Sequence, residues 1–106
     1  MPNDSDRIYP LVGLAKKAGK TVTGSELCIK EMSAGKVILA IVAEDASDNT
    51  KKRIRNACAA RKIEYVEYGV GEMLGKMTGS DNRMVVGIKD KNLGNLILSR
   101  MHVERS

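Results

Sequence analysis

An uninterrupted apolar run, Val37 to Ala43, constrains the fold more than any other feature of this sequence. A strand without polar positions has no face to offer to water, so helices must cover both of its faces, as they do in largely parallel sheets. The run is far too short to cross a membrane. The sequence therefore predicts a buried central strand between two helical layers.

Patterns typical of helices and strands alternate along the rest of the chain. At 106 residues the chain has the length of one domain, so we expect a single domain over residues 1–106. Alternation of this kind predicts the α/β class, with a three-layer α/β/α sandwich around a mixed sheet of about four strands. The expected strands are 21–23, 37–43, 63–68 and 84–89, with helices before, between and after them.

Several residues carry specific local predictions. Thr23-Gly24-Ser25-Glu26 is a capping-box pattern, and it predicts a helix from there to Ala34. Ser47 or Asp48 is expected to cap the next helix, which runs to about Arg61, and Asp90 the last one. The first helix is expected to be capped by Asp4, Ser5 and Asp6 and to hold Pro10 in its first turn. Its apolar face is expected to consist of Ile8, Leu11, Leu14, Ala15 and Ala18. The last helix is expected to bury Leu93, Leu96, Ile97 and Met101.

The charge balance favours a polyanionic partner. The chain has 18 Lys and Arg against 13 Asp and Glu, a formal net charge of +5. Six basic residues and no acidic one fall between Lys51 and Lys62. A solvated helix face would explain the same cluster equally well.

The cysteines and the chain start indicate a cytoplasmic protein. Cys28 and Cys58 lie in helical patterns without CxxC spacing, so we expect buried free thiols in a reducing compartment. The first residues are polar and acidic, unlike a signal peptide. No membrane association is expected.

Catalysis finds little support in the sequence. His102 is the only histidine and lies near the end of the chain, so no nucleophile pair with histidine can be assembled. Glu44 and Asp45 follow the central strand and could form an acid–base pair or a metal site, but capping of the next helix explains them more simply. We therefore expect no enzyme and no cofactor, with a small-molecule enzyme as a minor alternative.

The aromatic content narrows the kinds of nucleic-acid binding that the chain can support. It has no Phe or Trp and only three Tyr, too few for a platform on which successive bases stack. Any binding of RNA must therefore come from helix termini, basic side chains and polar loops that contact a structured RNA.

One ordered combination of motifs is specific. Gly24 with Lys30 is followed by the apolar strand with Glu44-Asp45, and then by Leu74-Gly75 with Gly79. Over residues 8 to 101 the chain resembles the L-seven-Ae family of ribosomal proteins, most closely its bacterial YlxQ-like branch. The resemblance implies an α/β/α sandwich that binds RNA kink-turns, internal loops with tandem sheared G·A pairs, without catalysis or cofactor.

The resemblance also implies an RNA site. The family motif is Gly-x-Asn-Glu-x-x-Lys, and this sequence matches its glycine at Gly24 and its lysine at Lys30. Glu26 stands at the Asn position and Leu27 at the Glu position. Gly24 and Ser25 would leave free backbone N–H groups at a helix N-terminus, which suits a phosphate. Glu26 only accepts hydrogen bonds and Leu27 makes none, so base reading is altered.

The second RNA element implied by the resemblance is the loop Ser80, Asp81, Asn82, Arg83 and Met84, expected beside that helix N-terminus. Lys20, Lys36 and Lys51 are expected to add basic support. The expected partner of this monomer is a structured ribosomal or regulatory RNA, with the ribosome as one candidate location. The alternative is a translation-associated protein-interaction module with only nonspecific RNA affinity, which Glu26 and Leu27 favour.

Overall fold

Helices and strands alternate along the whole of the described chain. The computed structural model describes residues 5–105, and side chains from residue 7 to residue 101. In chain order the elements are α1 (Ser5–Lys17), β1 (Thr21–Thr23), α2 (Ser25–Ser33), β2 (Leu39–Val42), α3 (Asp48–Arg61), β3 (Glu64–Glu67), α4 (Gly71–Met77), β4 (Val85–Ile88) and α5 (Lys91–Arg105).

The four strands form one mixed sheet in the order β1-β4-β2-β3. β2 and β3 are parallel, whereas β4 runs antiparallel to both β2 and β1. Val42 at the end of β2 pairs with Val85 at the start of β4, and Thr23 at the end of β1 pairs with Val86. The carboxyl ends of β1, β2 and β3 therefore meet the start of β4 at one edge of the sheet.

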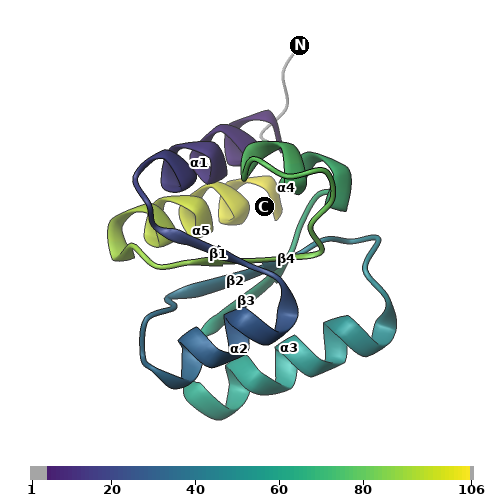
Figure 1. Ribbon diagram of the computed structural model, residues 1–106. Helices are drawn as coiled ribbons and strands as arrows, with labels where there is room; N and C mark the ends of the chain where they lie inside the picture. The colour runs from purple at the N-terminus through teal and green to yellow at the C-terminus, as the bar shows by residue number, and fades with distance from the viewer. Residues whose placement is uncertain (1–4, 106) are drawn as a thin grey trace.

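Helices cover both faces of this sheet, as the apolar run predicted. Figure 1 shows α1, α4 and α5 on one face and α2 and α3 on the other. Leu39, Ile41 and Ala43 pack into the core on the α1, α4 and α5 side, while Ala40 and Val42 pack into the core on the other side. The three-layer sandwich with a mixed four-stranded sheet is confirmed.

The inward face of α1 differs from the prediction. Ile8, Val12 and Ala15 are fully buried, whereas Leu14 is 51% exposed and Ala18 lies beyond the helix. Each helical position turns by about 100°, so a stripe through 8, 12 and 15 leaves position 14 outside it. Leu96 on α5 is likewise 39% exposed, although it was expected in the core.

The start of α1 also corrects the sequence reading. The helix begins at Ser5, so Ser5 and Asp6 lie inside it, and Asp4 lies outside the described residues. Pro10 falls in the second turn and not in the first. A proline there removes one intrahelical hydrogen bond, and the packing of α1 against α4 and α5 compensates for that loss.

Candidate nucleic-acid interface

The N-terminus of α2 is open. Its N-cap is Gly24, with φ 91° and ψ 146°, and no side chain hydrogen-bonds to the cap. The predicted capping box is therefore wrong, because Thr23 is held in β1 opposite Val86 and cannot serve as the cap. The first N–H groups of a helix have no partner within the helix, so those of Ser25, Glu26 and Leu27 stay free for a ligand. The expectation that the Gly24 N–H is also free is wrong, because this group is hydrogen-bonded to β4.

The loop after α4 ends beside this N-terminus. The Gly24 N–H donates to the Val85 carbonyl at 3.0 Å, and Val85 directly follows Met84 at the end of the loop. Ser80 and Met84 are half-buried, and the three residues between them are exposed. The structure thus brings together the two elements that the sequence placed in one site.

Two glycines of α4 hold the loop against the helix. The Ser80 N–H donates to the Gly75 carbonyl at 2.7 Å, and the Arg83 N–H donates to the Gly71 carbonyl at 2.9 Å. A Cβ at Gly75 would lie 2.7 Å from the Asn82 backbone nitrogen, and one at Gly71 would lie 2.6 Å from Asn82 Oδ1. Gly75 is therefore required for this close approach, because a Cβ there would meet backbone, whereas a Cβ at Gly71 would meet only side-chain atoms that can move. The i, i+4 spacing of the two glycines on one helix face was the signal that sequence reasoning missed.

Glu44 and Asp45 position the chain that leads into α4. Glu44 Oε2 accepts a hydrogen bond from the Gly69 N–H at 3.2 Å, and Asp45 Oδ1 accepts one from the Gly71 N–H at 2.9 Å. The expectation that they cap α3 is wrong, because Ser47 Oγ fills that role by accepting from the Thr50 N–H at 3.1 Å. The two carboxylates thus support the α4 end of the site.

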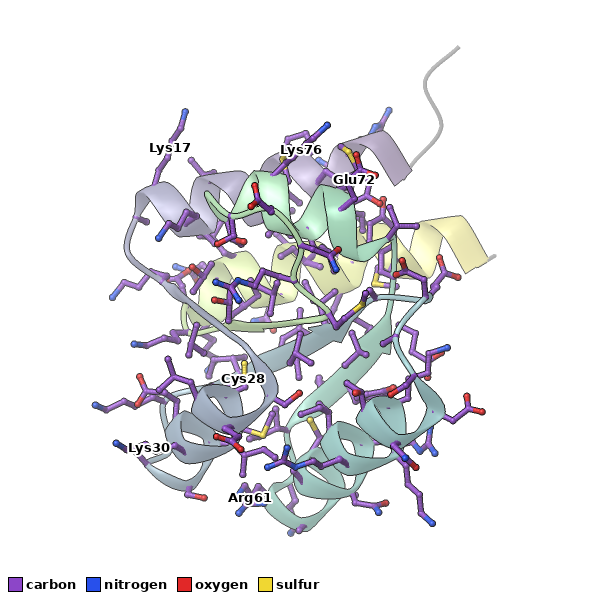
Figure 2. The ribbon with its side chains drawn as sticks, turned by 45° about the vertical axis from the view of Figure 1, so that its right-hand side comes forward. Lys17, Cys28, Lys30, Arg61, Glu72 and Lys76 are labelled. Atoms are coloured by element: carbon purple, nitrogen blue, oxygen red, sulfur yellow. The ribbon has the colours of Figure 1, made fainter. Side chains whose placement is uncertain are left out.

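Lys30 lies on the outer face of α2, in its last turn. Figure 2 shows its side chain projecting away from the molecule, with Cys28 of the same helix turned toward the sheet. The i, i+4 spacing places Glu26 on the same face, but none of the ion pairs between described residues joins the two. Leu27 is 52% exposed on the same helix. A ligand at the start of α2 therefore meets Glu26 and Leu27 before it reaches Lys30.

Lys20 and Lys36 lie at the opposite edge of the sheet. The Lys20 carbonyl accepts from the Lys89 N–H at 2.8 Å, just beyond the end of β4. Lys36 leads into the start of β2, and its Nζ is 3.9 Å from Glu31 Oε2. Lys89 Nζ hydrogen-bonds to Glu31 at 3.1 Å, and this bond is the main cause that lowers the pKa of the Glu31 carboxyl. The structure does not bring Lys20 and Lys36 to the α2 N-terminus.

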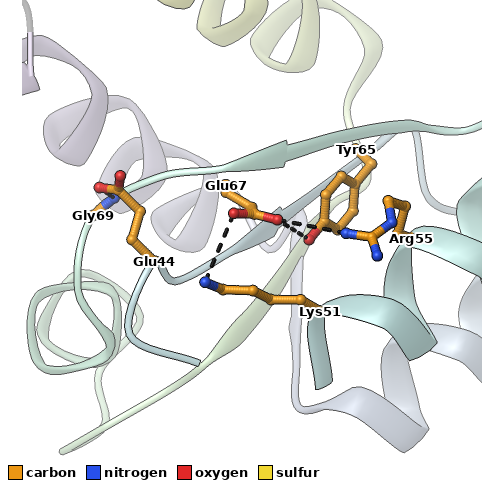
Figure 3. Close-up of polar contacts among 6 residues, drawn as sticks. All are labelled: Glu44, Lys51, Arg55, Tyr65, Glu67 and Gly69. Carbon is orange, nitrogen blue, oxygen red and sulfur yellow. Dashed lines mark hydrogen bonds and ion pairs between the residues drawn. The ribbon is translucent and has the colours of Figure 1, made fainter. Parts of the chain in front are cut away.

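Lys51 lies at the same edge as Gly24 but beside the outermost strand. Figure 3 shows Lys51 and Arg55 of α3 reaching Glu67 on β3, each at 3.8 Å. The Tyr65 hydroxyl also donates to Glu67, at 2.8 Å, and burial followed by this hydrogen bond raises the pKa of the Tyr65 phenol. Lys51 therefore belongs to a cluster of polar side chains around Glu67, which partly neutralises its charge.

The described part of the chain offers neither a cluster of metal ligands nor a helix that could span a membrane. Between residues 5 and 105, no group of three or more His, Cys, Asp or Glu side chains could hold a metal ion. None of the helices there combines the length and the apolar character needed to cross a lipid bilayer. Cys28 and Cys58 are buried free thiols, as expected from the sequence.

Comparison with known proteins settles the family. Residues 6–97 match the model of the ribosomal protein L7Ae/L30e/S12e/Gadd45 family. The chain belongs to this family. The matched range runs from α1 into α5 and includes both elements of the candidate site.

The relatives of this family member include two bacterial proteins with the same name. The RNA-binding protein YlxQ of Bacillus subtilis is 36% identical over 91 residues, which cover 86% of this chain and 91% of that protein. The RNA-binding protein YlxQ of Enterococcus faecium is 37% identical over 84 residues, covering 76% and 77% of the two chains.

Solved structures share the fold of this chain. A protein of unknown function from Bacillus halodurans C superposes with a TM-score of 0.86 at 32% identity, covering 90% of this chain and 96% of that one. The 15.5 kD RNA-binding protein of Giardia lamblia superposes with a TM-score of 0.76 at 22% identity, covering 96% and 88%. At that identity the second likeness concerns the fold alone.

Proposed function

We propose that this protein is a non-catalytic RNA-binding protein that recognises kink-turn RNA through the N-terminus of α2 and the loop Ser80–Met84. The observation that carries the proposal is the Gly24 to Val85 hydrogen bond of 3.0 Å, which fixes an open helix N-terminus beside an exposed polar loop. The YlxQ relatives from two bacteria bear the name RNA-binding protein, and membership of a ribosomal-protein family points the same way.

Phosphate binding follows from the open end of α2. Unpaired N–H groups and the positive end of the helix dipole favour an anion at this position. Arg83 is exposed in the neighbouring loop, and Lys30 is exposed further along α2. A bent RNA backbone that crosses from α2 to the loop would meet N–H donors first and then two flexible cations. Contacts of this kind position the RNA without reading its sequence.

Base reading would then depend on a different set of groups from those in the family motif. Glu26 can accept a hydrogen bond from a guanine amino group, whereas Leu27 offers only an apolar contact. Ser80 and Asn82 in the loop supply both donors and acceptors. Recognition would therefore rest more on RNA shape and on the loop than on the two altered positions of α2.

The proposal extends to the state and place of the protein. We expect a monomeric single domain that works in the cytoplasm, on ribosomal or regulatory RNA. Neither a cofactor nor a metal ion is part of the proposed mechanism.

The test compares two RNAs of equal length and charge, one with a kink-turn and one an uninterrupted duplex. Equal charge removes the general attraction of a basic protein, so any preference must come from the site meeting a particular backbone shape. We expect the kink-turn to bind at least about 100-fold tighter, close to 2.7 kcal/mol. Equal affinities measured by titration would reject the kink-turn assignment.

Two lysine variants provide the matched control. Lys30→Ala removes a cation from the proposed site and should reduce the ratio of the two affinities. Lys52→Ala removes an exposed cation from α3, on a different helix, and should lower both affinities together. If neither variant changes the ratio and the wild type binds both RNAs alike, the exposed Leu27 would favour the protein-interaction module as the function instead.

A further inference from the structure

An open groove lies between α1 and α4, in the outer helical layer. It has a volume of about 550 Å³ and is lined by Pro10, Gly13, Leu14, Lys16, Lys17, Lys76, Met77 and Gly79. None of the residues in the proposed RNA site contributes to it. Along α1 the groove runs from Pro10 to Lys17, which corresponds to roughly 10 Å of helix.

The floor of the groove is apolar and accessible. Leu14 lies outside the buried stripe of α1 and is 51% exposed, and Met77, which also lines the groove, is only partly buried. Pro10 contributes a further apolar surface at one end. An exposed leucine alone is ordinary, but an apolar floor inside a concave surface is typical of a contact with another molecule.

Gly13 deepens the groove without serving the fold. A Cβ at this position would meet only Met77 Sδ at 3.7 Å and the Met77 carbonyl at 3.9 Å, which are ordinary contacts. Glycine inside a helix is less stable than alanine by about 0.5–1 kcal/mol. Alanine would therefore fit and stabilise α1, so the glycine has no structural advantage here. Its effect is to keep the floor open between Pro10 and Met77.

The rim of the groove is basic. Lys16 and Lys17 come from α1 and Lys76 from α4, and Figure 2 shows Lys17 and Lys76 projecting from the same end of the molecule. Glu72 Oε1 lies 3.8 Å from Lys76 Nζ, but both side chains are largely exposed, Glu72 at 73% and Lys76 at 60%. An exposed i, i+4 pair of this kind contributes little and can exchange partners readily.

We propose that the groove between α1 and α4 docks a segment of a partner protein in which carboxylate side chains flank apolar ones. The apolar residues would cover Leu14 and Met77, and the carboxylates would pair with the lysines of the rim. No aromatic residue lines the groove, so an RNA strand would gain only the lysine contacts and leave the floor uncovered. An acidic amphipathic segment uses both parts of the groove, and an amphipathic helix laid in a groove is a recurring mode of recognition.

The probe is a displayed library of random peptides about 12 residues long, which would span roughly 18 Å as helices. Peptides are selected on the wild-type protein alone, and the enriched peptides are then tested on Gly13→Leu, whose side chain would fill the groove. We expect the enriched peptides to combine Glu or Asp with apolar residues. They should bind about 10-fold or more weakly to Gly13→Leu and to the double variant Lys16→Glu/Lys17→Glu, and unchanged to Lys52→Glu on α3.

Folding and location are checked on the same variants. Gly13→Ala should melt at an equal or higher temperature and keep peptide affinity, which separates filling of the groove from damage to the helix. With labelled protein, peptide binding should shift the amide resonances of Gly13, Leu14 and Met77. Failure of any selected peptide to discriminate the wild type from Gly13→Leu, or resonance shifts confined to another surface, would overturn the proposal. So would a uridine oligonucleotide that shifts these amides at lower concentration than the peptides.

The proposal does not depend on RNA binding. The kink-turn experiment probes α2 and the loop after α4, whereas the peptide experiment probes α1 and α4. Either result can therefore fail while the other stands.

Discussion

Cys28 and Cys58 illustrate how strongly the core controls single residues. They are 0% and 1% exposed on the α2 and α3 side of the sheet, and the Cys28 thiol donates to the Val22 carbonyl at 3.3 Å. Burial raises the pKa of Cys28 to about 12 and the pKa of Cys58 to about 11. Both thiols therefore stay protonated at neutral pH and act as small apolar side chains.

Replacing each cysteine by alanine should destabilise the protein and leave RNA binding unchanged. Cys28→Ala and Cys58→Ala each remove a buried sulfur, which we expect to lower the free energy of unfolding by about 1 kcal/mol or more. Urea titration measures this loss. RNA titration of the double variant serves as the control, because a folded double variant with weakened RNA binding would contradict a purely structural role.

The raised thiol pKa values also predict a loss of stability in alkali. Above pH 9 the thiols ionise in the unfolded chain but keep their protons in the folded one, so folding binds protons and stability falls as pH rises toward 11 and 12. Tyr65, whose pKa burial also raises, acts in the same direction. The free energy of unfolding should fall less steeply between about pH 8 and pH 10.5 in the double alanine variant than in the wild type. Identical slopes would show that the thiols do not contribute.

At the scale of elements, the contact between α4 and the loop after it is the most sensitive part of the site. Gly75→Ala would place a Cβ 2.7 Å from the Asn82 backbone nitrogen and 2.7 Å from the Asp81 carbonyl carbon. Backbone atoms cannot rotate away, so the loop must shift, at a cost of about 1–3 kcal/mol. We expect a lower melting temperature and weaker kink-turn binding. Gly13→Ala in α1, where space is open, is the matched control and should change neither for the worse.

The elements that sequence reasoning located best are those whose signal is local. The apolar run from Val37 to Ala43 predicted a strand covered on both faces without knowledge of any other segment. Ser47 caps α3 through a hydrogen bond to Thr50, three residues along the chain. The capping box failed because Thr23 was already committed to a strand, opposite Val86. Leu14 and Leu96 failed because periodicity identifies an apolar face only to within about one residue.

The sequence predicted which elements form the candidate site, but it did not predict the contacts that hold these elements in place. The motif pointed to Gly24, Lys30 and the loop from Ser80, and the structure places α2 and this loop side by side. The bond from the Gly71 N–H to Asp45 spans 26 residues, and no pattern in the sequence encodes such a pair. Nor could spacing along the chain reveal that Lys20 lies at the far edge of the sheet.

For the whole molecule, the distribution of charge matters more than its total. The net charge of +5 is spread over both edges of the sheet and over both helical layers. Lys20 and Lys36 lie at the edge opposite Gly24, where the Lys36 side chain pairs with Glu31 at 3.9 Å. We expect Lys20→Ala to change the affinity for kink-turn RNA less than about twofold, below about 0.4 kcal/mol, whereas Lys30→Ala should weaken it clearly. Equal losses in the two variants, measured by titration, would place Lys20 on the RNA.

The salt dependence of binding tests the same division between shared charge and local shape. Every RNA is attracted to a molecule with a charge of +5, and this attraction falls with salt by a slope of about −0.7 to −0.9 in log K per phosphate contact. The open N–H groups of α2 and the side chains of Ser80 and Asn82 in the loop are uncharged donors and acceptors that salt screens only weakly. When monovalent salt is raised at constant Mg²⁺, both the kink-turn and the duplex should therefore lose affinity, while their ratio changes much less than either. A ratio that falls to one at high salt would show that selectivity comes from charge, and that the α2 N-terminus and the loop do not read RNA shape.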